Sequence, residues 1–229
     1  MIPYVPPEQQ VRDKAEFARK GIARGRSIIA VDYADGVLLL AENPSTALHK
    51  ISEVYDRIAF AGVGRYNEFE TLRKAGIRQA DLMGYLYSRE DVTAMGLATA
   101  FAQTLGIIFT RDPKPYEVEV LIAEIGEQGD AHRLFRVTYD GTLFDERNFV
   151  AIGGKAEQLS EALEELWEEG MTLERSLDIG SDAFRRAEGR ESEGWEAAVL
   201  DLSNGRRAFR RLDPDDLPQP RPGDSNGAS

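Results

Sequence analysis

The sequence predicts an α+β fold in which two antiparallel β-sheets pack face to face between two helical layers. Short apolar runs and helical patterns alternate in the order strands, two helices, strands, two helices, strands. A chain of 229 residues can bury one substantial core. We therefore expect a single domain over residues 9–212, preceded by an arm at 1–8 and followed by a disordered tail at 213–229.

The composition excludes several classes of function. The net charge of −12 argues against general nucleic-acid binding. The chain has no cysteine, and its two histidines, His49 and His132, lack metal-ligand spacing. No apolar run approaches the roughly 18 residues that span a membrane, and the amino terminus does not resemble a secretory signal. We expect a cytoplasmic protein with no cofactor, no metal and no membrane contact.

The most informative stretch is residues 25–64. Apolar runs at 27–31 and 37–41 flank Ala34-Asp35-Gly36, a hairpin signal. A polar connection then ends in His49-Lys50, and a third apolar run follows at 58–63. These runs are typical of neighbouring buried antiparallel strands.

The segment before these strands begins with prolines at positions 3, 6 and 7, which predict an extended arm. A helix over about residues 8–23 follows, with one apolar stripe. The stripe consists of Val11, Ala15, Ala18 and Ile22.

The remaining elements follow from the same patterns. Helices are expected near residues 67–83, 88–105, 155–169 and 173–187, and strands near 116–125, 132–139, 142–144, 149–152, 195–202 and 206–212. Asn67, Ser88 and their acidic partners three residues on indicate helix starts, and Asn204-Gly205 indicates a tight hairpin. Residues 11–26 carry six Lys/Arg, and residues 157–174 carry seven Glu without a basic residue. Such runs are usually solvated helix faces, although opposite faces of an assembly are an alternative.

Several motifs resemble the proteasome subunit family. They are Gly25-Arg26-Ser27, Asp35-Gly36-Val37 followed by Glu42, Lys50-Ile51 and Ala59-Phe60-Ala61-Gly62. The segments KGIARGRS, AENPS, KISEVYDRI and AQTLG with KPYEVEV are similar to the actinobacterial α type. The resemblance covers about residues 3–212. It implies the four-layer α-β-β-α sandwich of N-terminal-nucleophile hydrolases.

The resemblance also implies a test for catalysis. Active β subunits of the family use a Thr that becomes the first residue of the mature chain, so that its own amine serves as base. The matching junction here is Gly25-Arg26, and a guanidinium is neither a nucleophile nor deprotonatable. Ser27 lies one position on, where its side chain would point to the opposite face of the strand. Gly153-Gly154 lacks the family's supporting serine. We expect no catalytic residue.

An α subunit of this family implies a role in assembly and gating. Seven copies would form each outer ring, stacked on rings of a β subunit that holds the catalytic threonine. The ring would dock a ring-shaped ATPase or other activator that delivers proteins tagged with the prokaryotic ubiquitin-like protein. The gating arm would consist of Ile2, Pro3, Tyr4, Val5, Pro6, Pro7 and Glu8.

Lys50 matches the family's lysine that binds the carboxylate at the end of an activator tail, between neighbouring subunits. Gly25 and Gly64 match small residues that leave room for the tail, and Arg65 adds a second cation nearby. From the residues alone, Lys50 is more often a surface lysine or a member of a structural ion pair.

Two other interpretations stay open. The chain could be an active N-terminal-nucleophile hydrolase matured by cleavage before Ser27. It could also be a non-enzymatic homo-oligomer of this fold without a β partner.

Overall fold

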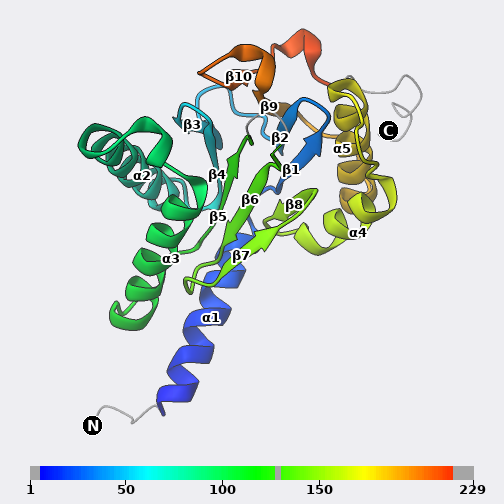
Figure 1. The fold of residues 1–229 in the computed structure, drawn as a ribbon. Helices are drawn as coiled ribbons and strands as arrows, with labels where there is room; N and C mark the ends of the chain where they lie inside the picture. Colours follow the sequence, from blue (N-terminus) through cyan, green and yellow to red (C-terminus); the bar gives the residue numbers. More distant parts are fainter. Residues whose placement is uncertain (1–5, 127–129, 219–229) are drawn as a thin grey trace.

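The computed structural model describes residues 6–126 and 130–218. Over these ranges the chain forms two five-stranded antiparallel sheets that pack face to face, with helices on both outer faces (Figure 1). The predicted four-layer α-β-β-α arrangement is therefore confirmed. No helix within the described ranges is long and apolar enough to cross a bilayer.

The strands and helices have the following bounds. The first sheet contains, in spatial order, β10 (Phe209–Arg211), β9 (Trp195–Asp201), β2 (Gly36–Glu42), β1 (Ile28–Tyr33) and β8 (Phe149–Ile152). The second sheet contains β3 (Ile51–Tyr55), β4 (Ile58–Gly64), β5 (Val118–Glu124), β6 (Arg133–Val137) and β7 (Leu143–Glu146). The helices are α1 (Pro7–Ala23), α2 (Tyr66–Leu86), α3 (Ala94–Arg111), α4 (Ala156–Leu166) and α5 (Leu173–Glu188).

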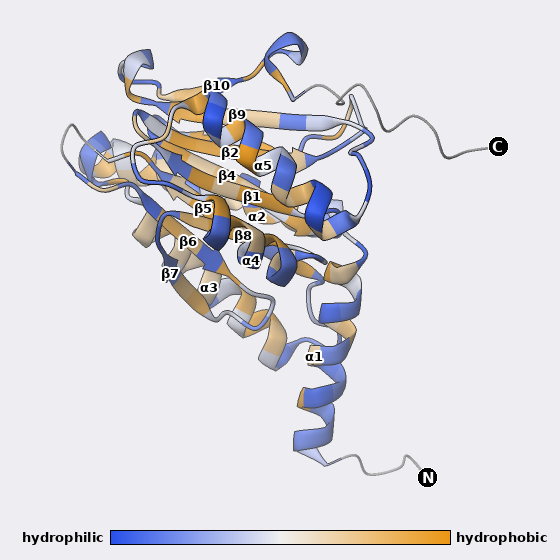
Figure 2. Cartoon of the chain, turned by 90° about the vertical axis from the view of Figure 1, so that its right-hand side faces the viewer, coloured by the Kyte–Doolittle hydropathy of each residue, from blue (hydrophilic) through white to orange (hydrophobic). Residues whose placement is uncertain are grey.

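Each interface between layers is held by its own apolar residues. Along β1, Ile28 and Ala30 belong to the core between the sheets, whereas Ile29 and Val31 pack toward α4 and α5. This alternation is the two-residue period of a strand that is buried on both faces. Figure 2 shows the strands mostly in the hydrophobic colour and the helices α1, α4 and α5 largely in the hydrophilic one. Fully burying one side chain of this size contributes about 1.5–3 kcal/mol, so the layers are strongly associated.

The helix α1 extends beyond the body of the molecule (Figures 1 and 2). Its last turns pack on the core through Ala18 and Ile22. Val11, on the predicted apolar stripe, is 53% exposed, because the body does not reach that far along the helix. The Lys14 ammonium donates to the carbonyls of Phe109 and Asp112 at the end of α3, at 3.0 and 2.7 Å.

The predicted arm is shorter than expected. Residues 1–5, which include Ile2, Pro3, Tyr4 and Val5, lie outside the described residues. Pro6 precedes α1, while Pro7 and Glu8 are helical. Proline fits the first helical position because its missing N–H has no intrahelical partner there.

Several predicted boundaries need correction. The strand β3 was missed, because it lies at the sheet edge and its central residues Ser52 and Glu53 are polar and half-buried. Asn204-Gly205 does not form a two-residue hairpin, since a 3₁₀ turn at Leu202–Asn204 intervenes and β10 begins only at Phe209.

The predicted helix starts also shift. The helix α2 begins at Tyr66, without a side-chain cap. The Ser88 capping box belongs to a 3₁₀ turn at Arg89–Asp91, and Thr93 caps α3. In the predicted tail, Pro214–Asp216 forms another 3₁₀ turn, and residues 219–229 lie outside the described part.

The hairpin between β1 and β2 is confirmed, with Ala34 and Asp35 as its turn. Gly36 pairs with Tyr33 inside the sheet and also lies against β9. A Cβ at Gly36 would lie 1.9 Å from the carbonyl oxygen of Leu200. The glycine is therefore required by the close approach of β9 rather than by the turn.

We predict that Gly36→Ala destabilises the protein by about 1–3 kcal/mol, because the methyl group forces the β2 and β9 backbones apart. Thermal unfolding measures the effect. The control is Gly96→Ala, at an exposed position in α3 where the nearest atom to a new Cβ is the Thr93 hydroxyl oxygen at 3.3 Å. Equal melting temperatures for the two variants would contradict the prediction.

Candidate functional site

The site lies where three segments meet at one end of the sheets. Gly25 and Arg26 precede β1, Lys50 precedes β3, and Gly64 ends β4. The Lys50 ammonium donates to the Arg26 carbonyl at 2.9 Å and to the Glu42 carbonyl at 3.2 Å. A Cβ on Gly25 would lie 3.1 Å from the Gly64 nitrogen. The fold therefore brings together residues that are up to about 40 positions apart in the sequence.

The electrostatic environment of Lys50 is unusual for a lysine. Burial, helped by the charge of Arg26 and opposed by the charges of Glu196 and Glu42, lowers the pKa of its ammonium to about 8. An ammonium has three N–H donors. Two are used on carbonyls, and the third has no acceptor in the described part of the chain. One donor is therefore left to meet an anion.

The Glu42 carboxylate is the centre of an ion-pair cluster. Its side chain is 2% exposed. Arg26 Nη1 lies 2.8 Å from Oε1, and Arg190 donates to both oxygens at 2.8 and 3.1 Å. Burial opposes ionisation of Glu42, but the hydrogen bonds from Arg190 and the Glu193 N–H, with the charge of Arg26, hold its pKa below the usual value. Arg26 also pairs with Glu193 at 2.5 Å.

The hydroxyl of Ser27 is not available as a nucleophile in this structure. Ser27 is buried, and its Oγ accepts a hydrogen bond from the Lys155 N–H at 3.0 Å. It lies beside the glycine pair, because a Cβ on Gly153 would approach the Ser27 Cα within 2.9 Å. Ser27 therefore connects the start of β1 to the start of α4.

The two predicted small positions, Gly25 and Gly64, have packing reasons within the chain. Gly64 has a φ of +113°, and a Cβ there would lie 1.9 Å from the Glu117 carbonyl oxygen. A Cβ on Gly25 would lie 2.5 Å from Val63 Cγ1. The guanidinium of Arg65 is ion-paired with Glu117, with Nε 2.8 Å from Oε1. Arg65 is therefore anchored beside Gly64.

Sequence reasoning missed Glu196, Arg190 and Glu193. Glu196 offered a weak signal: it shares the inward register of β9 with Ala198 and Leu200, so a carboxylate interrupts an apolar face. Arg190 and Glu193 offered none, because they lie in a connection without periodicity.

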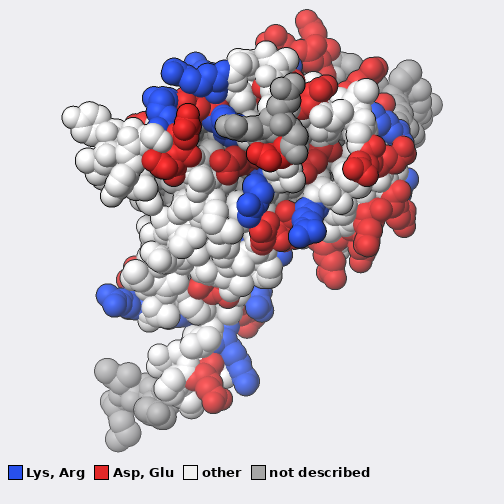
Figure 3. Space-filling model, viewed as in Figure 1, with Lys and Arg blue, Asp and Glu red and all other residues white. Residues whose placement is uncertain are grey.

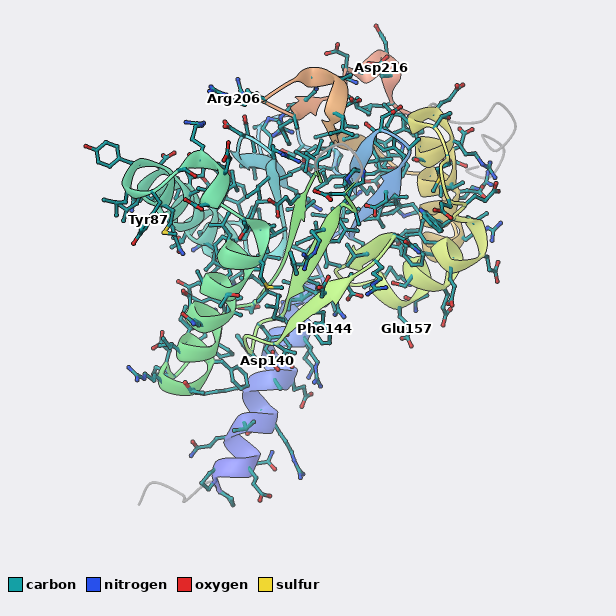
Figure 4. All side chains as sticks on the ribbon, in the orientation of Figure 1. Tyr87, Asp140, Phe144, Glu157, Arg206 and Asp216 are labelled. Carbon is teal, nitrogen blue, oxygen red and sulfur yellow. The ribbon has the colours of Figure 1, made fainter. Side chains whose placement is uncertain are left out.

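The acidic run lies on exposed surface, and so does the basic run except for the half-buried Lys14 and Arg26. All seven glutamates between positions 157 and 174 are exposed, as expected for a solvated face. Figure 3 shows acidic side chains gathered beside α4 and α5, and Figure 4 shows Glu157 pointing outward. His49 lies near Glu196, and His132 accepts from the Gly126 N–H at 3.1 Å. Within the described ranges, no cluster of His, Asp or Glu could hold a metal ion.

We predict that Glu42→Gln destabilises the protein at pH 7 by about 1–3 kcal/mol, because two partly solvated guanidinium groups lose their shared carboxylate. The depressed pKa of Glu42 adds stability above the usual glutamate pKa, and this contribution is lost as pH falls through the lower folded value. The difference from the unmodified chain should therefore shrink on acidification. Thermal unfolding at several pH values measures it, with exposed Glu161→Gln as the control. A difference independent of pH would contradict the prediction.

Comparison with known proteins places the chain in a family. The sequence model of the family described as "Proteasome subunit" matches residues 22–200. The chain is 56% identical to the proteasome subunit alpha of Thermomonospora curvata, over 91% of this chain and 92% of that protein. It is 55% identical to the subunit of the same name from Xylanimonas cellulosilytica, over 91% of each chain. It is 51% identical to proteasome subunit alpha 1 of Rhodococcus erythropolis, over 99% of this chain and 91% of the relative. The chain therefore belongs to the proteasome subunit family, within its actinobacterial α type.

Proposed function

We propose that the chain is the non-catalytic subunit of a cytoplasmic proteasome particle, whose proteolytic sites lie on a separate β subunit. The proposal rests on which residue stands at the position that matches the nucleophile of the β subunits. Arg26 occupies it and is ion-paired with Glu42 and Glu193. The nearest hydroxyl, on Ser27, is buried and accepts a backbone hydrogen bond.

Cleavage before Ser27, which an active hydrolase of this class would need, is disfavoured by the packing of α1. Its residues Ala18 and Ile22 belong to the core between the sheets. Removing the first 26 residues would expose that core and delete the arginine that pairs with Glu42.

Assembly into rings is supported by apolar side chains that a monomer leaves in water. The end of α2 exposes a group of large side chains, the α2 tip, which consists of Leu82, Tyr85, Leu86 and Tyr87. Figure 4 shows Tyr87 at the outer end of this helix. Contiguous exposed apolar groups of this kind are typical of protein interfaces. By family, the partners would be six further copies of this chain in a heptameric ring and the β subunit.

The second part of the proposal is that Lys50, Gly25, Gly64 and Arg65 form a pocket for the terminal carboxylate of an activator tail. The activator would be a ring-shaped ATPase that delivers proteins tagged with the prokaryotic ubiquitin-like protein. The free N–H of the Lys50 ammonium can meet a carboxylate. The low dielectric of its half-buried position would strengthen that pair once formed.

The third part is a gate made by the residues before α1. The gate would consist of the segment that precedes α1, and Pro7 and Glu8, which the sequence placed in the gate, are helical.

The overall proposal is tested by native mass and peptidase activity, for this chain alone and after mixing with its β partner. We expect activity only in the mixture, at the mass of a four-ring particle. Intact mass should show that residues 1–26 are retained. Peptidase activity from this chain alone, with Ser27 as the new first residue, would establish an active hydrolase instead. A stable oligomer of this chain that does not bind the β subunit would favour the interpretation as a non-enzymatic homo-oligomer.

The pocket is tested with two peptides that carry the last eight residues of the ATPase and end in a carboxylate or a carboxamide. We expect the assembled particle to prefer the carboxylate by about tenfold, from one charge-assisted hydrogen bond. The preference should weaken as pH rises through about 8, where Lys50 loses its proton. Lys50→Ala should abolish the preference at every pH. Fluorescence anisotropy measures binding. A carboxylate preference that persists in Lys50→Ala would contradict the proposed pocket.

A further inference from the structure

We propose that Glu196 is the positioning residue of the Lys50 pocket. Glu196 lies on β9 and does not reach the Lys50 ammonium with a hydrogen bond. It fixes the backbone from which that side chain projects. The inference rests on the proposed function of Lys50.

The Glu196 carboxylate is buried and accepts four hydrogen bonds. Its Oε2 accepts from the Lys50 backbone N–H at 2.9 Å and from Asn43 Nδ2 at 2.7 Å. Its Oε1 accepts from the Ile51 N–H at 3.1 Å and from Arg211 Nη1 at 2.8 Å. Two consecutive amides around Lys50 are therefore held by one carboxylate.

The segment that carries Lys50 is restrained by hydrogen bonds, among them one from the Gly62 N–H to the Lys50 carbonyl at 3.1 Å and one from the Asn43 N–H to the Gly194 carbonyl at 2.9 Å. Residues 43–50 form no helix or strand, and Leu48 within them is exposed. Their conformation is held by polar contacts, among them the hydrogen bond that Asn43 Nδ2 donates to the Leu48 carbonyl at 2.7 Å. Asn43 donates from the same nitrogen to Glu196. The carboxylate of Glu196 is thus the common acceptor for both ends of the segment.

Glu196 is a rigid anchor because of its place in the fold. The strand β9 lies between β10 and β2 in the first sheet, whereas β3 is the edge strand of the second. Arg211 on β10 donates to Glu196 and also, at 2.5 Å, to the Ile51 carbonyl. Glu196 and Arg211 together join the two sheets at the point where the chain passes from Lys50 into β3.

Glu196 also acts on Lys50 through its charge. The charged groups near the ammonium are Arg26, Glu42 and Glu196, and His49 and Arg211 lie against Glu196 itself. Of the carboxylates, Glu196 raises the pKa of Lys50 the most. Neutralising Glu196 should therefore deprotonate Lys50 at a lower pH, a change that a purely structural residue would not produce.

The test variant is Glu196→Gln in the assembled particle. A glutamine replaces one acceptor oxygen with an N–H₂ donor, which must face either Lys50 and Asn43 or Ile51 and Arg211. The matched control is Glu119→Gln. Glu119 is equally buried on a strand, at 8% exposure for both, and accepts from the Gly153 N–H and from Arg136. It makes no hydrogen bond or ion pair with Lys50 in the described chain.

Binding of the carboxylate and carboxamide peptides gives the result. We expect Glu196→Gln to lose most of the about tenfold carboxylate preference, and to shift the remaining pH dependence to lower pH. Glu119→Gln should keep both the preference and the pH midpoint. The double variant with Lys50→Ala should show no further loss beyond Lys50→Ala, because both residues act on one contact.

The outcomes separate this inference from the pocket itself. If Lys50→Ala abolishes the carboxylate preference while Glu196→Gln keeps it, the positioning role is wrong and the pocket stands. If Lys50→Ala keeps the preference, the pocket fails and the positioning role fails with it. If Glu196→Gln does not assemble, Asn43→Ala removes one donor and keeps the Glu196 charge. It should then lower the preference without moving the pH midpoint, and an unchanged preference would overturn the inference.

Discussion

The buried carboxylate of Glu42 is the constraint on which this end of the sandwich depends. An ionised carboxylate that is almost fully buried needs opposite charge, and Arg26 and Arg190 supply it. Arg26 comes from the start of β1 and Arg190 from the connection after α5, so one carboxylate fixes two segments. The Glu42 and Arg26 carbonyls in turn receive the Lys50 ammonium. Arg26 therefore both pairs with Glu42 and supplies a carbonyl acceptor to Lys50.

Half-burial gives Lys50 two opposite properties. The pKa of its ammonium is lowered, because water around it is partly replaced by protein and a guanidinium lies nearby. The same loss of water makes any carboxylate that reaches the remaining N–H a stronger partner than it would be at an open surface. The proposed pocket would therefore discriminate between charged and neutral chain ends better than an exposed lysine does, because exposed ion pairs contribute little.

The parts of the chain that leave the compact body are also those with unpartnered apolar groups. The first half of α1 extends away from the sheets with Val11 exposed on it, and Phe17 is exposed further along the helix. The α2 tip lies at another extremity. Burial within one chain explains neither feature. Both are consistent with a subunit whose neighbours in an assembled particle bury these groups. Such a subunit is more stable in the assembly than as an isolated chain.

The sequence by itself determined the alternation of strands and helices apart from β3, the two sheets and the layer on each outer face, and it supplied the chemistry of Arg26 on which the proposed lack of catalysis depends. These depend on local periodicity, on turn residues and on the chemistry of one side chain. Only the tertiary structure decided that β3 is an edge strand, that Val11 faces water, and that Asn204-Gly205 does not close a tight hairpin. It also decided the partners of the site: Glu42 meets Arg190 across 148 positions, and Glu196 meets Lys50 across 146. The first pair follows from the pairing of β2 with β9 within one sheet, and the second from the packing of the two sheets, neither of which a local pattern encodes.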